Sequence, residues 1–262
     1  MGNRMGFDFA RLGPPKGARV VVAGGCGGIG SAIVRGCIDT NLDVTVIDLP
    51  ATAEANSPPN EVKFVPFDAY DEESVTAAFA RIAEDGDSID ALANLVGSGD
   101  PPSPLVETET ASFDSVISRN LRSAFLIAKA AMPMLRKSGH GALVNTASGA
   151  AFRGLPGVGS YTAAKAGLIG MTKTLAVENA PQVRANVIAP GGVTNKVKVT
   201  KGKEDEAVGP NGLPVGHILK TIPMGRFADP EDIVGPMLFL MGPMSGYMTG
   251  QVLHLSGGML TP

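Results

Sequence analysis

Short apolar runs alternate along most of the chain with segments in which apolar residues recur at helical spacing. Apolar runs of roughly four to eight residues bounded by turn residues are typical of buried strands. We expect strands at residues 19–25, 43–48, 62–67, 89–96, 142–146, 183–189 and 251–255. Strands that alternate with helices predict a parallel sheet covered by helices on both faces.

Helical spacing of apolar residues is found at 29–37, 75–82 and 113–128. Asp71 is placed to cap the second of these helices. In the third, Asn120 is a polar member of an otherwise apolar stripe. Without a composition shift or an internal repeat, we expect a single α/β domain over residues 1–262, with a doubly wound, seven-stranded parallel sheet. The long, charged, Gly- and Pro-containing connection at 193–222 is predicted to be a mobile lid.

Composition narrows the function classes. The 262 residues carry a net charge of -3, and no basic stripe points to a nucleic-acid partner. The two cysteines form no CxxC pair, which favours a reducing compartment, and the three histidines show no metal-ligand spacing. No leader-like segment or bilayer-length apolar run is visible, so we expect a cytoplasmic protein without a membrane or metal partner.

A glycine cluster follows the first predicted strand. Residues 24–30 read Gly-Gly-Cys-Gly-Gly-Ile-Gly, and glycines at a strand-to-helix turn let the backbone approach a pyrophosphate. Asp48 ends the second strand about 20 residues later, where an acid binds adenosine ribose hydroxyls and repels a 2′-phosphate. Neither Leu49 nor Pro50 is cationic, so NAD is favoured over NADP. Asp68 is a weaker candidate for the adenine edge, and a purely structural role for the glycines or Asp48 stays open.

A proton-transfer site is indicated by Ser148, Tyr161 and Lys165. Tyr161 and Lys165 are spaced to share one helix face. An ammonium beside a phenol favours the phenolate, so we expect Lys165 to lower the pKa of Tyr161. Ser148 can hold the same substrate oxygen, which predicts chemistry on a carbonyl or an alcohol.

Taken together and in order, these motifs resemble those of the short-chain dehydrogenase/reductase family from about Gly17 to Met259. The matching segments are GGCGGIG at 24–30, Asp48, Asp68, ANLVG at 93–97, Asn120, Ser148, YTAAK at 161–165, PGG at 190–192 and the C-terminal GQVLHLSGG. The resemblance implies a Rossmann fold and a homo-oligomer, a dimer or a tetramer.

The resemblance also implies roles for individual residues. Tyr161 is then the general acid or base, Lys165 lowers its pKa and binds the nicotinamide ribose, Ser148 orients the substrate oxygen, and Asn120 holds a water that links Lys165 to solvent. A structural hydrogen-bonding role for Asn120 stays open beside this one. The full set of expected cofactor contacts is Gly24, Gly28, Ile29, Gly30, Asp48, Asp68, Asn94, Gly97, Tyr161, Lys165, Pro190, Gly192 and Val193.

The function that this set predicts is NAD-dependent interconversion of a secondary alcohol and a ketone. One alternative is reduction of an activated double bond, although enoyl reductases of the family usually space the tyrosine and lysine more widely. Another is a catalytically silent, nucleotide-sensing protein. Expected walls of a partly apolar substrate pocket are Gly149, Ala150, Phe152, Leu155, Val158 and residues 98–102.

Overall fold

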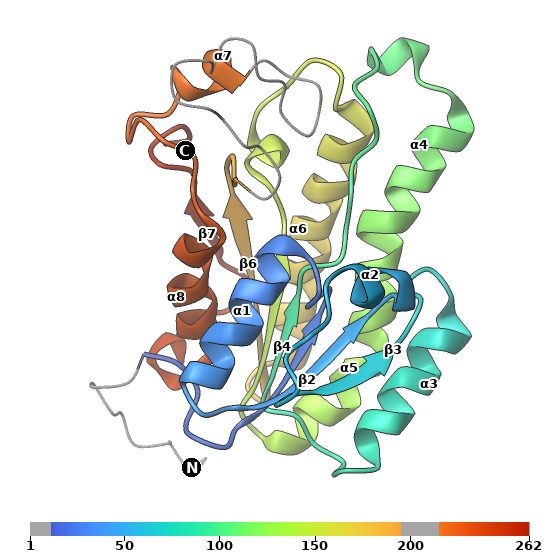
Figure 1. Ribbon diagram of the computed structural model, residues 1–262, viewed down its shortest axis with the longest axis vertical. Helices are drawn as coiled ribbons and strands as arrows, with labels where there is room; N and C mark the ends of the chain where they lie inside the picture. The colour runs from blue at the N-terminus through green and yellow to red at the C-terminus, as the bar shows by residue number, and fades with distance from the viewer. Residues whose placement is uncertain (1–11, 195–214, 262) are drawn as a thin grey trace.

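The computed structural model describes residues 12–194 and 215–261, so most of the expected lid, residues 195–214, lies outside the described residues. All seven expected strands join one parallel sheet in the order β3-β2-β1-β4-β5-β6-β7 (Figure 1). Their bounds are β1 (Arg19–Ala23), β2 (Asp43–Asp48), β3 (Lys63–Pro66), β4 (Ala91–Asn94), β5 (Gly141–Thr146), β6 (Val183–Pro190) and β7 (Val252–Leu255). The strand order reverses between β1 and β4, and a ligand crevice forms at the carboxyl ends of strands at such a point. The predicted doubly wound fold is confirmed.

Helices cover both faces of this sheet (Figure 1). The longer ones are α1 (Gly28–Asp39), α3 (Glu72–Ala83), α4 (Thr110–Ile117), α5 (Ser123–Ser138), α6 (Gly159–Asn179) and α8 (Pro230–Met241), and the shorter ones are α2 (Pro50–Ala55) and α7 (Val215–Leu219). Short 3-10 turns lie at η1 (Leu105–Glu107), η3 (Gly149–Phe152) and η4 (Pro243–Ser245). In the described part of the chain, no helix is both long and apolar enough to cross a bilayer.

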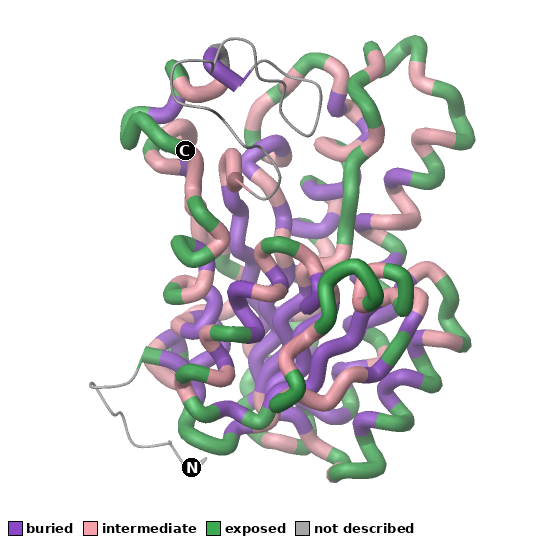
Figure 2. Tube along the Cα trace, in the orientation of Figure 1, coloured by how far each residue is buried: buried purple, intermediate pink, exposed green. Residues whose placement is uncertain are grey.

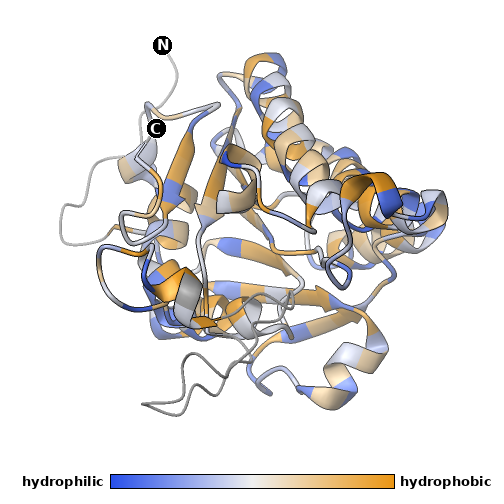
Figure 3. Cartoon of the chain, turned by 90° about the horizontal axis from the view of Figure 1, so that it is seen from above, coloured by the Kyte–Doolittle hydropathy of each residue, from blue (hydrophilic) through white to orange (hydrophobic). Residues whose placement is uncertain are grey.

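The central strands are largely apolar because both of their faces are buried, whereas the edge strands β3 and β7 are only partly buried (Figures 2 and 3). In β1, Val20 and Val22 belong to the core cluster that includes residues of α1 and α8. Val21 belongs to the opposite cluster, with residues of α3 and α5. This alternation is the period of two that a strand imposes on its side chains.

The helix expected over 113–128 is formed by α4, a π-helical turn (η2, Ser118–Arg122) and α5. Asn120 lies in the π-helical turn and is fully buried. Such turns are frequent at functional sites. Asp71 caps α3 as expected, since its side chain accepts hydrogen bonds from the backbone N–H groups of Glu73 and Ser74.

Candidate active site

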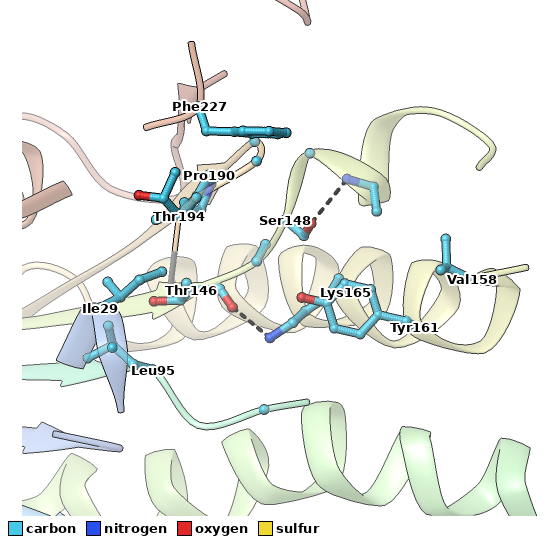
Figure 4. A pocket seen from close by; sticks show the side chains of 18 of the residues that line it. Ile29, Leu95, Thr146, Ser148, Val158, Tyr161, Lys165, Pro190, Thr194 and Phe227 are labelled. Carbon is cyan, nitrogen blue, oxygen red and sulfur yellow. Dashed lines mark hydrogen bonds between the residues drawn. The ribbon is translucent and has the colours of Figure 1, made fainter. Parts of the chain in front are cut away.

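A cavity of about 420 Å³ opens at the carboxyl edge of the sheet. Figure 4 shows Ile29 and Leu95 toward one end and Val158 toward the other, with Ser148, Tyr161 and Lys165 between them. Of the predicted site residues, those that line this cavity are Gly24, Gly28, Ile29, Gly30, Gly97, Ser148, Tyr161, Lys165, Pro190, Gly192 and Val193. Residues that are far apart in the sequence therefore meet in one place.

The glycine loop forms the end of the cavity near Ile29. Gly24 adopts a φ of +80° and packs against the backbone of Leu95. A Cβ at Gly30 would lie 2.0 Å from the carbonyl oxygen of Gly24, so the tight turn requires glycine there. Helix α1 begins at Gly28 without a side-chain cap from Gly27. Its first-turn N–H groups are thus available to a ligand anion, as a pyrophosphate requires.

Asp48 lies behind the glycine loop and does not line the cavity itself. One carboxylate oxygen accepts a hydrogen bond of 2.9 Å from the N–H of Cys26, and the other accepts one of 2.8 Å from the N–H of Leu49. Burial, together with the Asp48 charge, raises the pKa of the Cys26 thiol to about 11. The Asp48 carboxylate therefore fixes the loop and places a negative charge beside it.

Lys165 is buried, and its ammonium is held at the end of β5. Its Nζ donates a hydrogen bond of 2.9 Å to the carbonyl oxygen of Thr146 (Figure 4). Burial disfavours the charged form and lowers the pKa of Lys165 to about 8. The side chain is therefore fixed in position and close to its titration point in the physiological pH range.

Tyr161 lies one helical turn before Lys165, and the lysine Nζ is 5.6 Å from the centroid of the phenol ring. Desolvation raises the pKa of Tyr161, and hydrogen bonding with Ser148 only partly opposes this rise. The pKa of Tyr161 is therefore raised overall, opposite to the direction expected from the sequence. The physical reason is that burial removes water from around the phenol, while the ammonium of Lys165 is directed at the carbonyl of Thr146.

Ser148 precedes η3 and shapes the turn beside Tyr161. Its Oγ accepts a hydrogen bond of 3.2 Å from the N–H of Ala150 (Figure 4). This bond caps the short η3 turn and fixes the serine side chain within the cavity wall. The hydroxyl hydrogen, which can donate to the phenol oxygen of Tyr161, can donate instead to an oxygen of a bound molecule.

Asn120 lies directly behind the cavity wall. Its Nδ2 donates to the carbonyl oxygens of Ser98, at 2.7 Å, and Val116, at 2.9 Å. Its buried Oδ1 has no hydrogen-bond partner among the described residues. A Cβ at Gly97 would lie 2.4 Å from this Oδ1 and 2.9 Å from the Nζ of Lys165, so the glycine leaves the two polar atoms facing a shared space. This space fits the water-holding role that the resemblance implies for Asn120.

Two other predicted cofactor residues make hydrogen bonds outside the cavity wall. The Nδ2 of Asn94 donates to the Oδ1 of Asn145 at 2.9 Å, and the Nδ2 of Asn145 donates to the Oγ1 of Thr172 at 3.0 Å. Asp68 accepts a hydrogen bond of 2.8 Å from the N–H of Tyr70. Asn94 therefore joins β4 to β5 and α6 inside the core, whereas Asp68 shapes the turn before α3.

The substrate walls are partly as expected. Gly149, Ala150, Leu155 and Val158 line the cavity. Phe152 instead packs edge-on against His254, with ring centroids 4.3 Å apart. Several residues of the 98–102 loop line a smaller, neighbouring cavity that Tyr161 also contacts.

The sequence pattern missed several residues of the cavity wall. The wall also includes Thr146, Arg153, Thr194, Val215, Ile218, Phe227 and Met259. For Thr146 a signal existed, because it ends a predicted strand just before Ser148. Phe227 and Met259 carry no such signal. Of the expected lid at 193–222, the described residues Val193, Thr194, Val215 and Ile218 line the cavity.

Sequence comparison identifies relatives over almost the whole chain. The family profile described as Enoyl-(Acyl carrier protein) reductase matches residues 24–260. The 3-oxoacyl-[acyl-carrier-protein] reductase FabG of Thermotoga maritima is 32% identical over 235 residues, with 88% of each chain covered. The protein of the same name from Aquifex aeolicus is 31% identical, covering 93% of this chain and 98% of the relative. Nodulation protein G of Azospirillum brasilense is 31% identical, covering 91% and 96%.

Solved structures share the fold at lower sequence identity. A short-chain type dehydrogenase/reductase from Mycobacterium ulcerans superposes with a TM-score of 0.83 at 19% identity, covering 94% of this chain and 90% of that one. The aldohexose dehydrogenase of Thermoplasma acidophilum gives a TM-score of 0.82 at 22% identity, covering 94% and 98%.

Proposed function

Because this chain belongs to the short-chain dehydrogenase/reductase family, we propose that it is an NAD(H)-dependent oxidoreductase that interconverts a ketone and a secondary alcohol. The observation that carries the proposal is the convergence of Ser148, Tyr161 and Lys165 with the glycine loop on one cavity. The family uses a nicotinamide cofactor. The preference for NAD over NADP and the choice of a ketone or secondary alcohol as substrate are both part of this proposal.

The described residues fit a dinucleotide. Glycines 24, 27, 28 and 30 line one end of the cavity, where the uncapped first turn of α1 suits the pyrophosphate. Next to the reaction site, Thr146 has a buried Oγ1 without a hydrogen-bond partner among the described residues. Pro190, Gly192 and Val193 form a further wall, against which a nicotinamide would pack. When bound, the nicotinamide supplies or accepts the hydride.

The remaining steps are the work of the protein's own residues. Ser148 and Tyr161 donate hydrogen bonds to the substrate oxygen, which positions and polarises the carbonyl. Tyr161 then donates its proton as the carbonyl becomes a hydroxyl. The Lys165 ammonium stabilises the negative charge that the phenol oxygen gains. A water in the space between the Asn120 Oδ1 and the Lys165 Nζ, in front of Gly97, would pass a proton from solvent back toward Tyr161.

Ketone reduction is the proposed direction at neutral pH. The raised pKa of Tyr161 keeps its phenol protonated, which is the form that gives a proton. The relatives named 3-oxoacyl-[acyl-carrier-protein] reductases act on ketones by name, which supports the same direction. Oxidation of the alcohol requires the phenolate and is expected at higher pH.

The preference for NAD rests on Asp48. Its carboxylate lies against the glycine loop through the N–H of Cys26, where the adenosine ribose of a dinucleotide binds. A 2′-phosphate placed there would be repelled by this charge. The glycine loop itself contains no arginine or lysine that could offset the repulsion.

A second candidate function is reduction of a conjugated double bond, which the match to the Enoyl-(Acyl carrier protein) reductase profile favours. The spacing of Tyr161 and Lys165 within one turn of α6 supports the ketone instead. The decisive experiment compares NADH oxidation with a panel of ketones and a panel of matched enones. Turnover of ketones to alcohols supports the proposal. Saturation of the enone double bond, or cofactor binding without any turnover, would overturn it.

We also propose a cytoplasmic homo-oligomer, a dimer or a tetramer. Phe125 on α5 and Val177 on α6 are 50% and 81% exposed and supply apolar surface that a second copy would bury. Both cysteines are free thiols, as a reducing compartment favours. Light scattering of the purified protein would give the oligomeric state.

A further inference from the structure

Arg153 is a cation of the cavity wall to which the reaction scheme gives no role. It follows η3, half-buried, five residues after Ser148. Among the described residues it makes no hydrogen bond and no ion pair. Arg119 and Arg226, by contrast, pair with the carboxylates of Asp100 and Asp232. An arginine without an anionic partner inside a cavity is available to a ligand.

The charge around Arg153 favours an anion. The described residues of the cavity wall include two cations, Arg153 and Lys165, and no aspartate or glutamate. The ammonium of Lys165 already donates to the carbonyl of Thr146, and the proposed reaction uses this lysine beside Tyr161. Cavity walls of low polarity strengthen the electric field of a charged side chain. Arg153 is therefore the side chain in this wall that is available to attract an anion.

Arg153 lies on a segment of the cavity wall other than the glycine loop. The glycine loop lies toward the Ile29 end of the cavity, and Val158 lies toward the opposite end, beyond Ser148 and Tyr161 (Figure 4). Arg153 belongs to the 149–158 segment, with Leu155 and Val158 as apolar wall residues. A substrate held by Ser148 and Tyr161 would therefore share this cavity with Arg153.

We propose that Arg153 selects substrates that carry a carboxylate next to a short apolar body, so that the ketone substrate is an oxo acid. A guanidinium binds a carboxylate through two parallel hydrogen bonds, which also fixes the orientation of the ketone. This inference rests on the proposed ketone reduction and specifies its substrate class.

The test compares acids with their uncharged esters. The probes are 2-oxobutanoate, acetoacetate and levulinate, each beside its methyl ester, because they place the carboxylate at increasing distances from the ketone. The wild-type protein should favour one acid over its ester in kcat/KM. In Arg153→Gln that preference should fall by about tenfold to hundredfold, with Arg153→Lys between the two. Turnover of the esters and the KM for NADH should stay unchanged.

Arg35→Gln is the matched control, since Arg35 lies on α1 in an exposed ion pair with Glu231. Equal loss for acids and esters in Arg153→Gln, or equal preference for both in the wild type, overturns the inference while leaving ketone reduction in place. If no probe is turned over, the panel of ketones decides the proposed function separately. Calorimetric titration of the protein with levulinate and with its methyl ester, in the presence of NADH, then tests whether Arg153 binds the carboxylate. Tighter binding of the acid that Arg153→Gln abolishes supports the role, and equal or undetectable binding of both overturns it.

Discussion

The ammonium of Lys165 donates a 2.9 Å hydrogen bond to the main-chain carbonyl of Thr146, which joins α6 to the end of β5 beneath the cavity. This contact fixes the lysine where its charge faces the reaction site. This one hydrogen bond does not make up for the water that the ammonium loses on burial. The pKa of Lys165 therefore falls to about 8. A charged group is thus retained at a cost to stability, which is a common feature of functional sites.

Replacement of Lys165 by methionine should stabilise the fold and abolish activity. A fall in pKa from 10.5 to about 8 corresponds to roughly 3 kcal/mol. The lost hydrogen bond offsets part of this, so we expect a gain of about 1–2 kcal/mol in the free energy of unfolding. Below about pH 8 the lysine is charged in both the folded and the unfolded state, and the full gain applies. It should disappear as pH rises toward about 10.5, where both states are neutral.

Urea unfolding of both proteins at pH 7 and at pH 10 measures this difference. Lys129→Met is the control, because Lys129 is exposed and pairs with Glu72. The Lys129→Met substitution should change the free energy of unfolding by less than about 1 kcal/mol at both pH values. A Lys165→Met protein that is less stable than the wild type at pH 7 would contradict the prediction.

The raised pKa of Tyr161 predicts opposite pH profiles for the two reaction directions. Ketone reduction needs the protonated phenol and should be retained through neutral pH, then fall at alkaline pH. Alcohol oxidation needs the phenolate and should rise over the same alkaline range. The measurement is kcat/KM in each direction from about pH 6 to 10. An oxidation rate already at its plateau near pH 6 would show a lowered pKa instead.

Removal of the Tyr161 hydroxyl should eliminate proton transfer while leaving the cavity intact. We expect Tyr161→Phe to lower kcat by roughly 10²–10⁴-fold, with the dissociation constant for NADH changed little. Tyr247→Phe is the matched control, since Tyr247 is fully exposed and lies away from this cavity. Stopped-flow turnover and fluorescence titration of NADH separate the two effects. Retained turnover in Tyr161→Phe would remove the tyrosine from the mechanism.

A methyl group at Gly97 should block the space between Asn120 and Lys165. The residue has a φ of +147°, and its Cβ would lie 2.4 Å from the Asn120 Oδ1. We expect Gly97→Ala to lower kcat at least tenfold and the free energy of unfolding by about 1–3 kcal/mol. Gly170→Ala in α6 is the control, because its Cβ would meet open space and should stabilise the helix by about 0.5–1 kcal/mol. Equal kcat and equal free energy of unfolding in the two variants would contradict a functional space between Asn120 and Lys165.

Neutralising Asp48 should weaken the discrimination against NADP. We expect Asp48→Asn to shift the ratio of kcat/KM for NADPH and NADH by about tenfold toward NADPH, because the repulsion of a 2′-phosphate is removed. Asp43→Asn, at the other end of β2, is the control and should leave the ratio unchanged, since Asp43 is exposed near Arg19. A wild-type protein that already prefers NADPH would contradict the proposed cofactor choice.

Local patterns in the sequence were sufficient for the framework of this fold. The apolar run of β1, the glycines before α1 and the cap at Asp71 each act over a few neighbouring residues, and the structure places each as expected. The helix α2 was missed because its six residues are solvent-facing, without buried members, and so carry no hydrophobic period. The Tyr161 and Lys165 pair was likewise a local spacing on one helix.

The chemistry of the site was decided by contacts between distant segments. Lys165 and Thr146 are 19 positions apart, and no spacing rule links an ammonium to a particular carbonyl. Desolvation is a collective effect of everything packed around a group, so the rise in the pKa of Tyr161 had no signature near Tyr161. The sequence by itself determined the alternation of strands and helices, the glycine turn and the placing of Tyr161 and Lys165 on one helix, because these depend on short-range periodicity. Tertiary structure alone placed Arg153 in the wall and raised the pKa of Tyr161, because burial at a cavity depends on the whole fold.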